Sequence, residues 1–199
     1  MVQQIFVIHG GDSFLTYRAY IDFLKNFEID FSKESKKRWK DNLQEDLGEG
    51  YEVIKPRMPN QFNAKYLEWK IWFEKHFPIV RDDIILLGHS MGGVFLAKYL
   101  SEGKFPKKIK ATFLVSAPFD TDEDERPINE FVLPSSLENF EKQSEKIFLY
   151  HSRDDPVVDF GEIAKYKKAL TNSEVNVFED RQHFDQERFP EIVEKIKSL

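Results

Sequence analysis

Six short apolar runs, separated by longer amphipathic segments, dominate the pattern of this 199-residue chain. The runs are rich in Ile, Val and Phe and fall at Ile5–Ile8, Tyr51–Ile54, Ile84–Leu87, Thr112–Val115, Ile147–Tyr150 and Val175–Phe178. Continuous apolar runs this short are typical of strands covered on both faces, and the segments between them show helical spacing. The alternation therefore predicts one parallel sheet, wound by right-handed crossovers, in an α/β fold.

The sequence predicts a single domain over residues 1–199, because no internal repeat or Pro/Gly/Ser-rich linker divides it. Cysteine is absent, which excludes disulfides, thiolate metal sites and a cysteine nucleophile. A net charge of −6 without a long basic run argues against a nucleic-acid or anionic-membrane partner. The first residues resemble no secretory signal, and no apolar stretch is long enough for a membrane helix. We expect a soluble, cytoplasmic protein.

The sequence Gly-His-Ser-Met-Gly at residues 88–92 fits the Gly-x-Ser-x-Gly pattern of a nucleophile elbow. It directly follows the predicted strand Ile84–Leu87, and a helical pattern begins straight after it. Such a turn exposes the serine at the carboxyl edge of the sheet, at a helix N-terminus whose dipole favours developing negative charge. Ser90 is therefore the predicted nucleophile; the alternative is an ordinary glycine-rich turn with an incidental serine.

A nucleophilic serine needs a histidine to accept its proton and an acid to orient that histidine. In the order Ser…Asp…His both partners follow Ser90, and the two histidines that do so are His151 and His183. His151 ends the fifth predicted strand and His183 follows the sixth, so His183 is the predicted base. Asp155 is the predicted acid because it begins Asp-Pro-Val-Val, a stretch that commonly follows the acid in such hydrolases; Asp154 is the alternative.

The sequence His-Gly-Gly-Asp at residues 9–12 follows the first predicted strand and is suited to one side of an oxyanion hole. Acyl transfer needs backbone N–H groups aimed at the carbonyl oxygen, and glycines allow close approach. We predict the amides of Gly11 and Met91 as the two donors, with Asp12 as the alternative to Gly11. The further candidates for contact with substrate are Gly10, Asp12, His89 and Phe14. His89 is also expected to pack beneath the elbow.

With these residues the chain resembles the α/β-hydrolase superfamily, and within it the small serine hydrolases grouped with retinoblastoma-binding protein nine and its bacterial relatives. The narrower resemblance rests on Lys-Pro-Arg-Met-Pro-Asn at 55–60, Trp69, the acidic loop 122–126 and Asp-Asp-Pro at 154–156. It implies a three-layer α/β-hydrolase fold. The sheet would have about six parallel strands with helices on both faces, without the superfamily's first antiparallel strands, and the cap would be minimal. It also implies a triad of Ser90, Asp155 and His183 and hydrolysis of small acyl esters.

Extra residues near Ser13–Ser35 set this chain apart from the family pattern. In this fold the insertion would border the active site, so it would form either a small lid or acyl-pocket wall, or a surface helix that packs its own apolar stripe. The residues of the lid hypothesis are Phe14, Leu15, Tyr17, Tyr20, Phe23 and Phe27.

Two charged segments are interpreted as solvated surface. The aspartates that alternate from Asp120 to Asp124 hint at calcium, but Glu125 and Phe131 occupy the positions where an EF-hand needs glycine and glutamate. No metal site is therefore predicted. The basic cluster Lys33–Lys40 is expected to be an exposed helix face.

These residues together predict a serine hydrolase that needs no cofactor and cleaves small carboxylic esters or thioesters through an acyl-enzyme. The same groups also suit an acyltransferase or a peptidase. A non-catalytic binding or regulatory protein on a hydrolase scaffold is the alternative from another class. Such proteins usually lose a triad residue or an elbow glycine, and neither is lost here. The expected partner is the small-molecule substrate, and the expected state is a monomer or small homo-oligomer.

Overall fold

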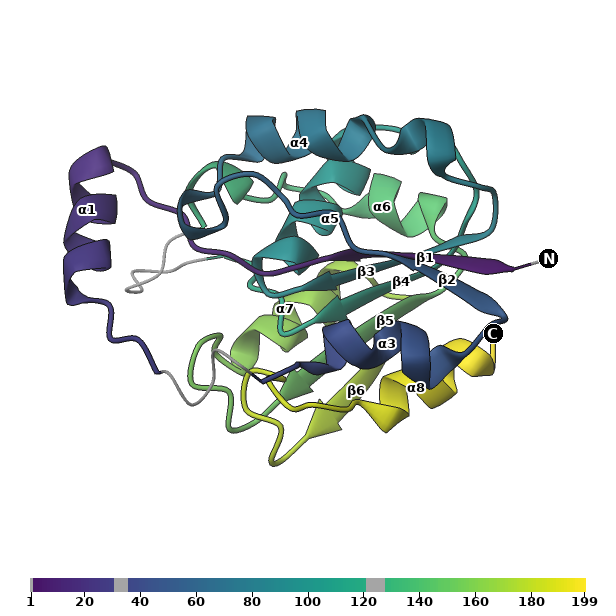
Figure 1. Cartoon of the computed structure of the whole chain (residues 1–199). Coiled ribbons are helices and arrows are strands. Elements are labelled where there is room, and N and C mark those ends of the chain that lie inside the picture. Colours follow the sequence, from purple (N-terminus) through teal and green to yellow (C-terminus); the bar gives the residue numbers. More distant parts are fainter. Residues whose placement is uncertain (1, 31–35, 121–127) are drawn as a thin grey trace.

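One six-stranded parallel sheet, in the order β2-β1-β3-β4-β5-β6, forms the centre of the molecule. The computed structural model describes residues 2–30, 36–120 and 128–199 (Figure 1). The strands are β1 (Gln3–Ile8), β2 (Tyr51–Ile54), β3 (Ile84–His89), β4 (Ile109–Val115), β5 (Ile147–Ser152) and β6 (Glu174–Phe178). All six predicted strands and their parallel pairing are confirmed, and β4 begins three residues earlier than its apolar run.

Helices cover both faces of the sheet, as predicted (Figure 1). One face carries α4 (Tyr66–Glu74), α5 (Met91–Glu102), α6 (Glu138–Gln143) and α7 (Gly161–Ala169), and the other carries α3 (Trp39–Leu47) and α8 (Pro190–Lys197). Because strand side chains alternate between faces, Phe6 and Ile8 of β1 pack on the first face and Ile5 and Val7 on the second. The chain thus forms the predicted three layers.

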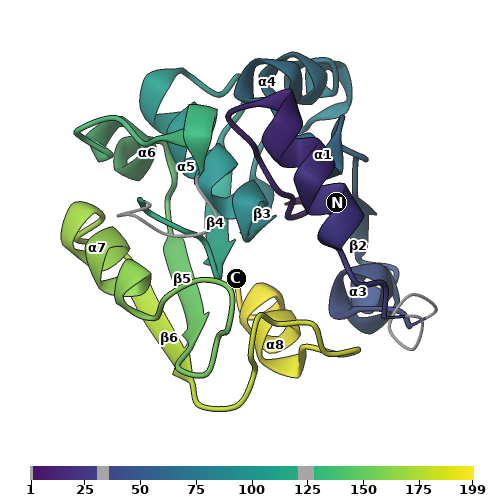
Figure 2. The ribbon, with the colours of Figure 1, turned by 90° about the vertical axis from the view of Figure 1, so that its left-hand side faces the viewer.

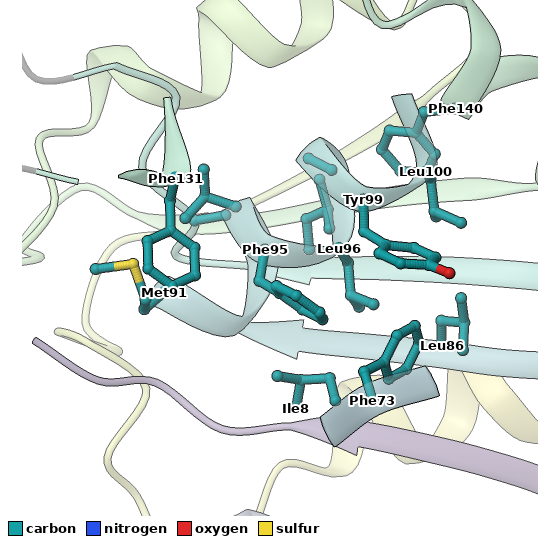
Figure 3. Packing of buried hydrophobic residues seen from close by; sticks show 14 of the residues in the cluster. Ile8, Phe73, Leu86, Met91, Phe95, Leu96, Tyr99, Leu100, Phe131 and Phe140 are labelled. Carbon is teal, nitrogen blue, oxygen red and sulfur yellow. The ribbon is translucent and has the colours of Figure 1, made fainter. Parts of the chain in front are cut away.

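Aromatic rings fill the core beneath α5. Phe73 of α4 packs edge-to-face on Phe95 of α5, with ring centroids 5.4 Å apart, and on Phe6 of β1 at 5.3 Å. Figure 3 shows the same packing along α5, which reaches Met91 and Phe131 at the helix N-terminus. This core fixes the start of α5, the point at which β3 turns into the helix.

Three short features depart from the sequence predictions. The edge strands β2 and β6 are only partly buried, and Val175 and Val177 of β6 are 38% and 40% exposed, because an edge strand has no neighbour on one side. Helix α6 was not predicted, since its six residues hold one buried apolar side chain, Phe140. Three 3-10 turns, η1 (Gln61–Asn63), η2 (Phe77–Ile79) and η3 (Asn129–Phe131), were not predicted either.

The helix α1 (Tyr17–Asn26) stands beyond the carboxyl end of β1, away from the layers (Figure 1). Viewed from that side, it lies in front of the sheet edge, between α4 and α3 (Figure 2). Thr16 caps the helix, accepting a hydrogen bond from the Ala19 amide at 3.1 Å, and none of its residues is buried. Among the described residues, no helix has the length and apolar character that crossing a bilayer would require.

Candidate active site

Ser90 occupies a sharp turn between β3 and α5. Its φ of 54° and ψ of −124° lie in a region that residues with a side chain rarely adopt, as expected of an elbow. The Ser90 amide donates to the Val115 carbonyl of β4 at 2.8 Å, and the Gly93 amide donates to the Ser90 carbonyl at 2.8 Å. These bonds hold the strained residue from both sides.

The glycines around Ser90 are required by close backbone contacts. A Cβ on Gly88 would lie 2.4 Å from the Gly92 carbonyl oxygen, and one on Gly92 would lie 2.3 Å from the Ile8 carbonyl oxygen. Both distances are far below van der Waals contact, so any side chain would push the turn apart. The contacts of this turn therefore leave no room for a side chain at either glycine of the Gly-x-Ser-x-Gly pattern.

Asp155 and His183 meet at the same edge of the sheet, on the loops that follow β5 and β6. The Nδ1 atom of His183 lies 2.9 Å from Oδ2 and 3.1 Å from Oδ1 of Asp155. The Asp155 side chain is fully buried and that of His183 is 12% exposed. Among the described residues, no hydrogen bond joins His183 to Ser90. The structure thus pairs the acid with the histidine and leaves the contact with the serine open.

Four groups surround the Asp155 carboxylate besides His183. The Ser116 hydroxyl donates to Oδ2 at 2.7 Å, the amides of Val157 and Val158 donate to Oδ1 at 2.8 and 3.1 Å, and His151 Nε2 lies 3.7 Å from Oδ2. Burial alone would raise the pKa of Asp155. The hydrogen bond and charge of His183, with the bonds from Ser116 and Val157, lower it below its usual value. The carboxylate is therefore ionised at neutral pH.

Asp154 has a different set of partners. Its Oδ1 atom accepts from the Ser152 hydroxyl at 2.5 Å and from the Gln182 amide at 2.8 Å. These bonds connect the loop after β5 to the loop that carries His183. Of the two aspartates considered, Asp155 contacts the histidine, whereas Asp154 bonds the Ser152 hydroxyl and the Gln182 amide.

The glycine loop after β1 lies against the elbow. A Cβ on Gly10 would come within 3.0 Å of the Ser90 Cβ, and one on Gly11 would come within 2.6 Å of the Gln61 carbonyl oxygen. Within the described ranges, no protein acceptor takes the amide N–H of Gly11 or Met91. The two predicted donors are thus both available. The alternative prediction, that the Asp12 amide is the second donor, is wrong, because this amide donates to the Gln61 carbonyl at 2.9 Å.

The ring of His9 fixes this glycine loop. Its Nδ1 lies 2.6 Å from the Gly10 carbonyl oxygen, and its Nε2 accepts from the Met58 amide at 2.9 Å. Burial lowers the pKa of His9, and the charge of Lys40 lowers it further. A neutral His9 satisfies both bonds, so its role is to shape the loop.

His89 and Lys40 depart from their predictions. His89 is 3% exposed, and its ring nitrogens lie 2.7 Å from Lys40 Nζ and 2.8 Å from the His183 carbonyl oxygen. It packs beneath the elbow, as expected, but it has no nitrogen left for substrate, so its assignment as a substrate contact is wrong. Lys40 was expected on an exposed face, but α3 turns it inward to His89.

The insertion brings Phe14 and the aromatic residues of α1 together at the rim. The ring centroids of Tyr20 and Phe23 lie 5.7 and 5.0 Å from that of Phe14. The backbone carbonyl of Phe14 accepts a hydrogen bond from Lys65 Nζ at 2.8 Å. Tyr17 of α1 is 73% exposed, whereas Tyr20, Ile21 and Phe23 are half-buried, so the lid and the surface helix that packs its own apolar stripe both stay predictions. Part of the insertion, residues 31–35, lies outside the described residues.

The acidic segment that was considered for calcium is only partly described, because residues 121–127 lie outside the described ranges. Asp120 forms an ion pair with Lys165 of α7. In the described parts of the chain, no group of three or more His, Asp or Glu side chains is placed to hold a metal ion.

Comparison with known proteins identifies the family of this chain. The family model for serine hydrolases matches residues 30–196. The chain belongs to this serine hydrolase family. Within it, Serine hydrolase RBBP9 of Rattus norvegicus is 26% identical over 152 residues, covering 75% of this chain and 78% of the rat protein.

Solved structures share the fold of this serine hydrolase. The ydeN gene product from B. subtilis superposes with a TM-score of 0.74 at 16% identity, covering 99% of this chain and 98% of that one. Est1E from Butyrivibrio proteoclasticus gives a TM-score of 0.60 at 15% identity, covering 99% and 86%. The chain therefore has the α/β-hydrolase fold and is related to RBBP9.

Two residues of this hydrolase site were missed by sequence reasoning. Ser116 directly follows β4 and contacts Asp155, and its position after a buried strand beside the elbow strand was a usable signal. Lys40 had no such signal, because its neighbours Lys36 and Lys37 have the same side chain but are exposed.

Proposed function

We propose that this serine hydrolase cleaves small carboxylic esters or thioesters, with Ser90 as nucleophile, His183 as general base and Asp155 as the acid that orients it. The observation that carries the proposal is the buried Asp155–His183 pair at the sheet edge where Ser90 is held in a strained turn. Because the carboxylate fixes the proton of His183 on Nδ1, its Nε2 carries no proton and can accept one from Ser90.

In the first step, Ser90 Oγ attacks the carbonyl carbon of the substrate and gives its proton to Nε2 of His183. The resulting imidazolium is stabilised by the ionised Asp155, which remains unprotonated. His183 then returns the proton to the leaving alkoxide or thiolate, and the acyl group stays on Ser90. The missing hydrogen bond between Ser90 and His183 is compatible with this step, since such contacts often tighten only when substrate binds.

The amides of Met91 and Gly11 would bind the negative oxygen of the tetrahedral intermediate. Met91 is the first residue of α5, so its N–H has no partner within the helix and lies at the positive end of the helix dipole. Removing one such donor typically lowers kcat about 100- to 1,000-fold. A water molecule activated by His183 then releases the acid and restores Ser90.

We further propose that α1 forms one wall of the acyl-binding side. Its support is the ring cluster of Phe14, Tyr20 and Phe23, together with the position of α1 beyond the sheet edge (Figure 2). An apolar acyl chain would cover rings that the domain itself leaves partly exposed.

Labelling with a fluorophosphonate probe tests the nucleophile. We expect the purified protein to be labelled at pH 7–8 and Ser90→Ala not to be, while both unfold at the same temperature. Hydrolysis of a panel of acetyl to octanoyl esters and thioesters should fall at least about 10⁴-fold in Ser90→Ala. Addition of alcohol or amine acceptors then separates hydrolysis from acyl transfer.

The opposite outcome would be equally clear. If folded wild-type protein is not labelled and cleaves no member of the panel, the proposal fails and a binding role on the hydrolase scaffold takes its place. If Ser90→Ala keeps the activity, the nucleophile is another residue.

A further inference from the structure

The loop that carries His183 is strained on both sides of the histidine. Gln182 has a φ of 47° and Phe184 a φ of 55°, both in the left-handed region that costs a residue with a side chain about 1 kcal/mol or more. Such a loop keeps its shape only if surrounding contacts hold it. The orientation of His183 therefore depends on what those contacts are.

Helix α3 supplies most of them. Trp39 Nε1 donates to the Phe184 carbonyl at 2.8 Å, and the Trp39 amide donates to the Gln186 carbonyl at 2.8 Å. The Arg38 guanidinium pairs with Asp185 at 2.8 Å. The start of α3 is thus bonded to residues 184–186, immediately after the histidine.

The carbonyl of His183 itself is held by His89. Its oxygen lies 2.8 Å from His89 Nε2, and the two rings are 4.8 Å apart between centroids. A carbonyl oxygen can only accept, so Nε2 of His89 carries a proton. In the neutral ring Nδ1 is then the acceptor, and Lys40 Nζ lies 2.7 Å from it as the donor.

We propose that Lys40 is a positioning residue for His183 and acts by holding His89 neutral, in the tautomer that donates to the His183 backbone. The proposal rests on the role of His183 as base. Without the donor at Nδ1, His89 is free to move its proton there, and its bond to His183 is lost. Protonation of both nitrogens would place a second positive charge 4.8 Å from the ring that must become an imidazolium.

The surroundings of Lys40 agree with this role. The groups that face it are His89 from β3, Asp185 from the His183 loop, Asp41 from α3, Arg38 directly before α3, and Lys55 from the segment after β2. Burial, partly offset by Asp185, lowers the pKa of Lys40 to about 7. Burial and the charge of Lys40 together lower the pKa of His89 well below its usual value. Lys40 donates to Nδ1 in either of its charge states, so the tautomer is the same on both sides of pH 7.

The test compares Lys40→Met with Lys55→Met. Both replace a lysine near the start of α3 by an apolar side chain of similar length, but Lys55 bonds Asp41 at 3.2 Å, and no bond in the described ranges joins it to His89. We expect kcat for a short ester to fall about tenfold in Lys40→Met with KM changed less than twofold, and to stay within twofold in Lys55→Met. The ¹⁵N signals of His89, measured without substrate, should show Nε2–H and a bare Nδ1 in the wild type and in Lys55→Met. In Lys40→Met they should shift toward a mixture of tautomers.

Several results would overturn the proposal. These are unchanged His89 signals and kcat in Lys40→Met, equal losses in the two variants, or a lowered melting temperature alone. If Lys40→Met does not fold, the wild-type spectrum still decides, because a proton on Nδ1 of His89 contradicts the proposed tautomer. The His89 signals are independent of turnover, so they remain informative if Ser90→Ala disproves the proposed function.

Discussion

The elbow and helix α1 lie at the same edge of the sheet but are built in opposite ways. Around Ser90, a single added methyl group at Gly88 or Gly92 would collide with backbone at 2.4 Å or less. In α1 no residue is buried, and the helix depends on its Thr16 cap, ion pairs such as Arg18–Asp22, and ring contacts along one face. The elbow therefore accepts no added side-chain atom at these glycines without a backbone shift, whereas a substitution in α1 would remove few contacts.

This difference fits the separate roles proposed above for the two regions. Atoms that make and break bonds need positions fixed to a fraction of an ångström, and tight backbone contacts provide this. A wall for acyl groups of varying length needs apolar surface rather than exact placement. The family match, which begins at residue 30, after α1, fits the same division. Substitutions in each region test whether the turn is rigid and the helix adaptable.

Asp155→Asn should have the largest effect. Asparagine still accepts from the Val157 amide, so the fold is kept, but it no longer fixes the Nδ1 proton of His183. We expect kcat to fall by about 10⁴-fold. Asp154→Asn, which keeps an oxygen acceptor for Ser152 and Gln182, should lose less than about tenfold. Steady-state kinetics on one ester measures both, and equal losses would contradict the assignment of the acid.

Gly92→Ala should destabilise the protein strongly. Its new methyl would meet the Ile8 carbonyl at 2.3 Å, so β1 or the start of α5 must shift. We expect a loss of about 3 kcal/mol in the free energy of unfolding. The control is Gly50→Ala, where nothing lies within 4 Å of the added group and the change should stay within about 0.5 kcal/mol. Urea titration followed by circular dichroism tests whether the elbow is as tight as described.

Phe23→Ser should change specificity without changing stability. Its ring lies 5.0 Å from Phe14 and 5.2 Å from Phe27, on the face proposed to contact the acyl chain. We expect kcat/KM for an octanoyl ester to fall about tenfold, with that for an acetyl ester unchanged. Arg18→Ser, at a side chain that is 93% exposed, should leave both values unchanged. An unchanged octanoyl-to-acetyl ratio in Phe23→Ser would remove the proposed role of α1.

The smallest effect concerns stability against pH. Lys40 has a pKa of about 7 in the folded chain and near its ordinary 10.5 when unfolded, so between these values the unfolded chain binds more protons. Stability therefore rises with pH across this window, and the cost of burying the charge is fully present below pH 7. Because Lys40 is partly exposed, we expect wild type to gain less than about 1 kcal/mol over Lys40→Met between pH 7 and 9. A matching curve for Lys55→Met and wild type is the control, and parallel curves for wild type and Lys40→Met would contradict the shift.

Local patterns were sufficient to predict the sheet and the elbow. The six strands follow from apolar runs, and the turn at Ser90 follows from a Gly-x-Ser-x-Gly motif contained in five consecutive residues. The errors concern residues whose partners are distant in the chain: the Asp12 amide meets Gln61, and Lys40 meets His89. Which lysine of a basic segment turns inward depends on how α3 packs, and no spacing in the sequence encodes that.

The bonds around Asp154 have a mechanical consequence. The Ser152 hydroxyl donates to Asp154 and accepts from the Arg181 amide, and Asp154 also accepts from the Gln182 amide. The loops after β5 and β6 are therefore joined by hydrogen bonds that do not involve Asp155 or His183. On heating, Asp155 and His183 should keep their relative positions until the whole sheet unfolds. Residual activity and the folded fraction should therefore decline along one curve.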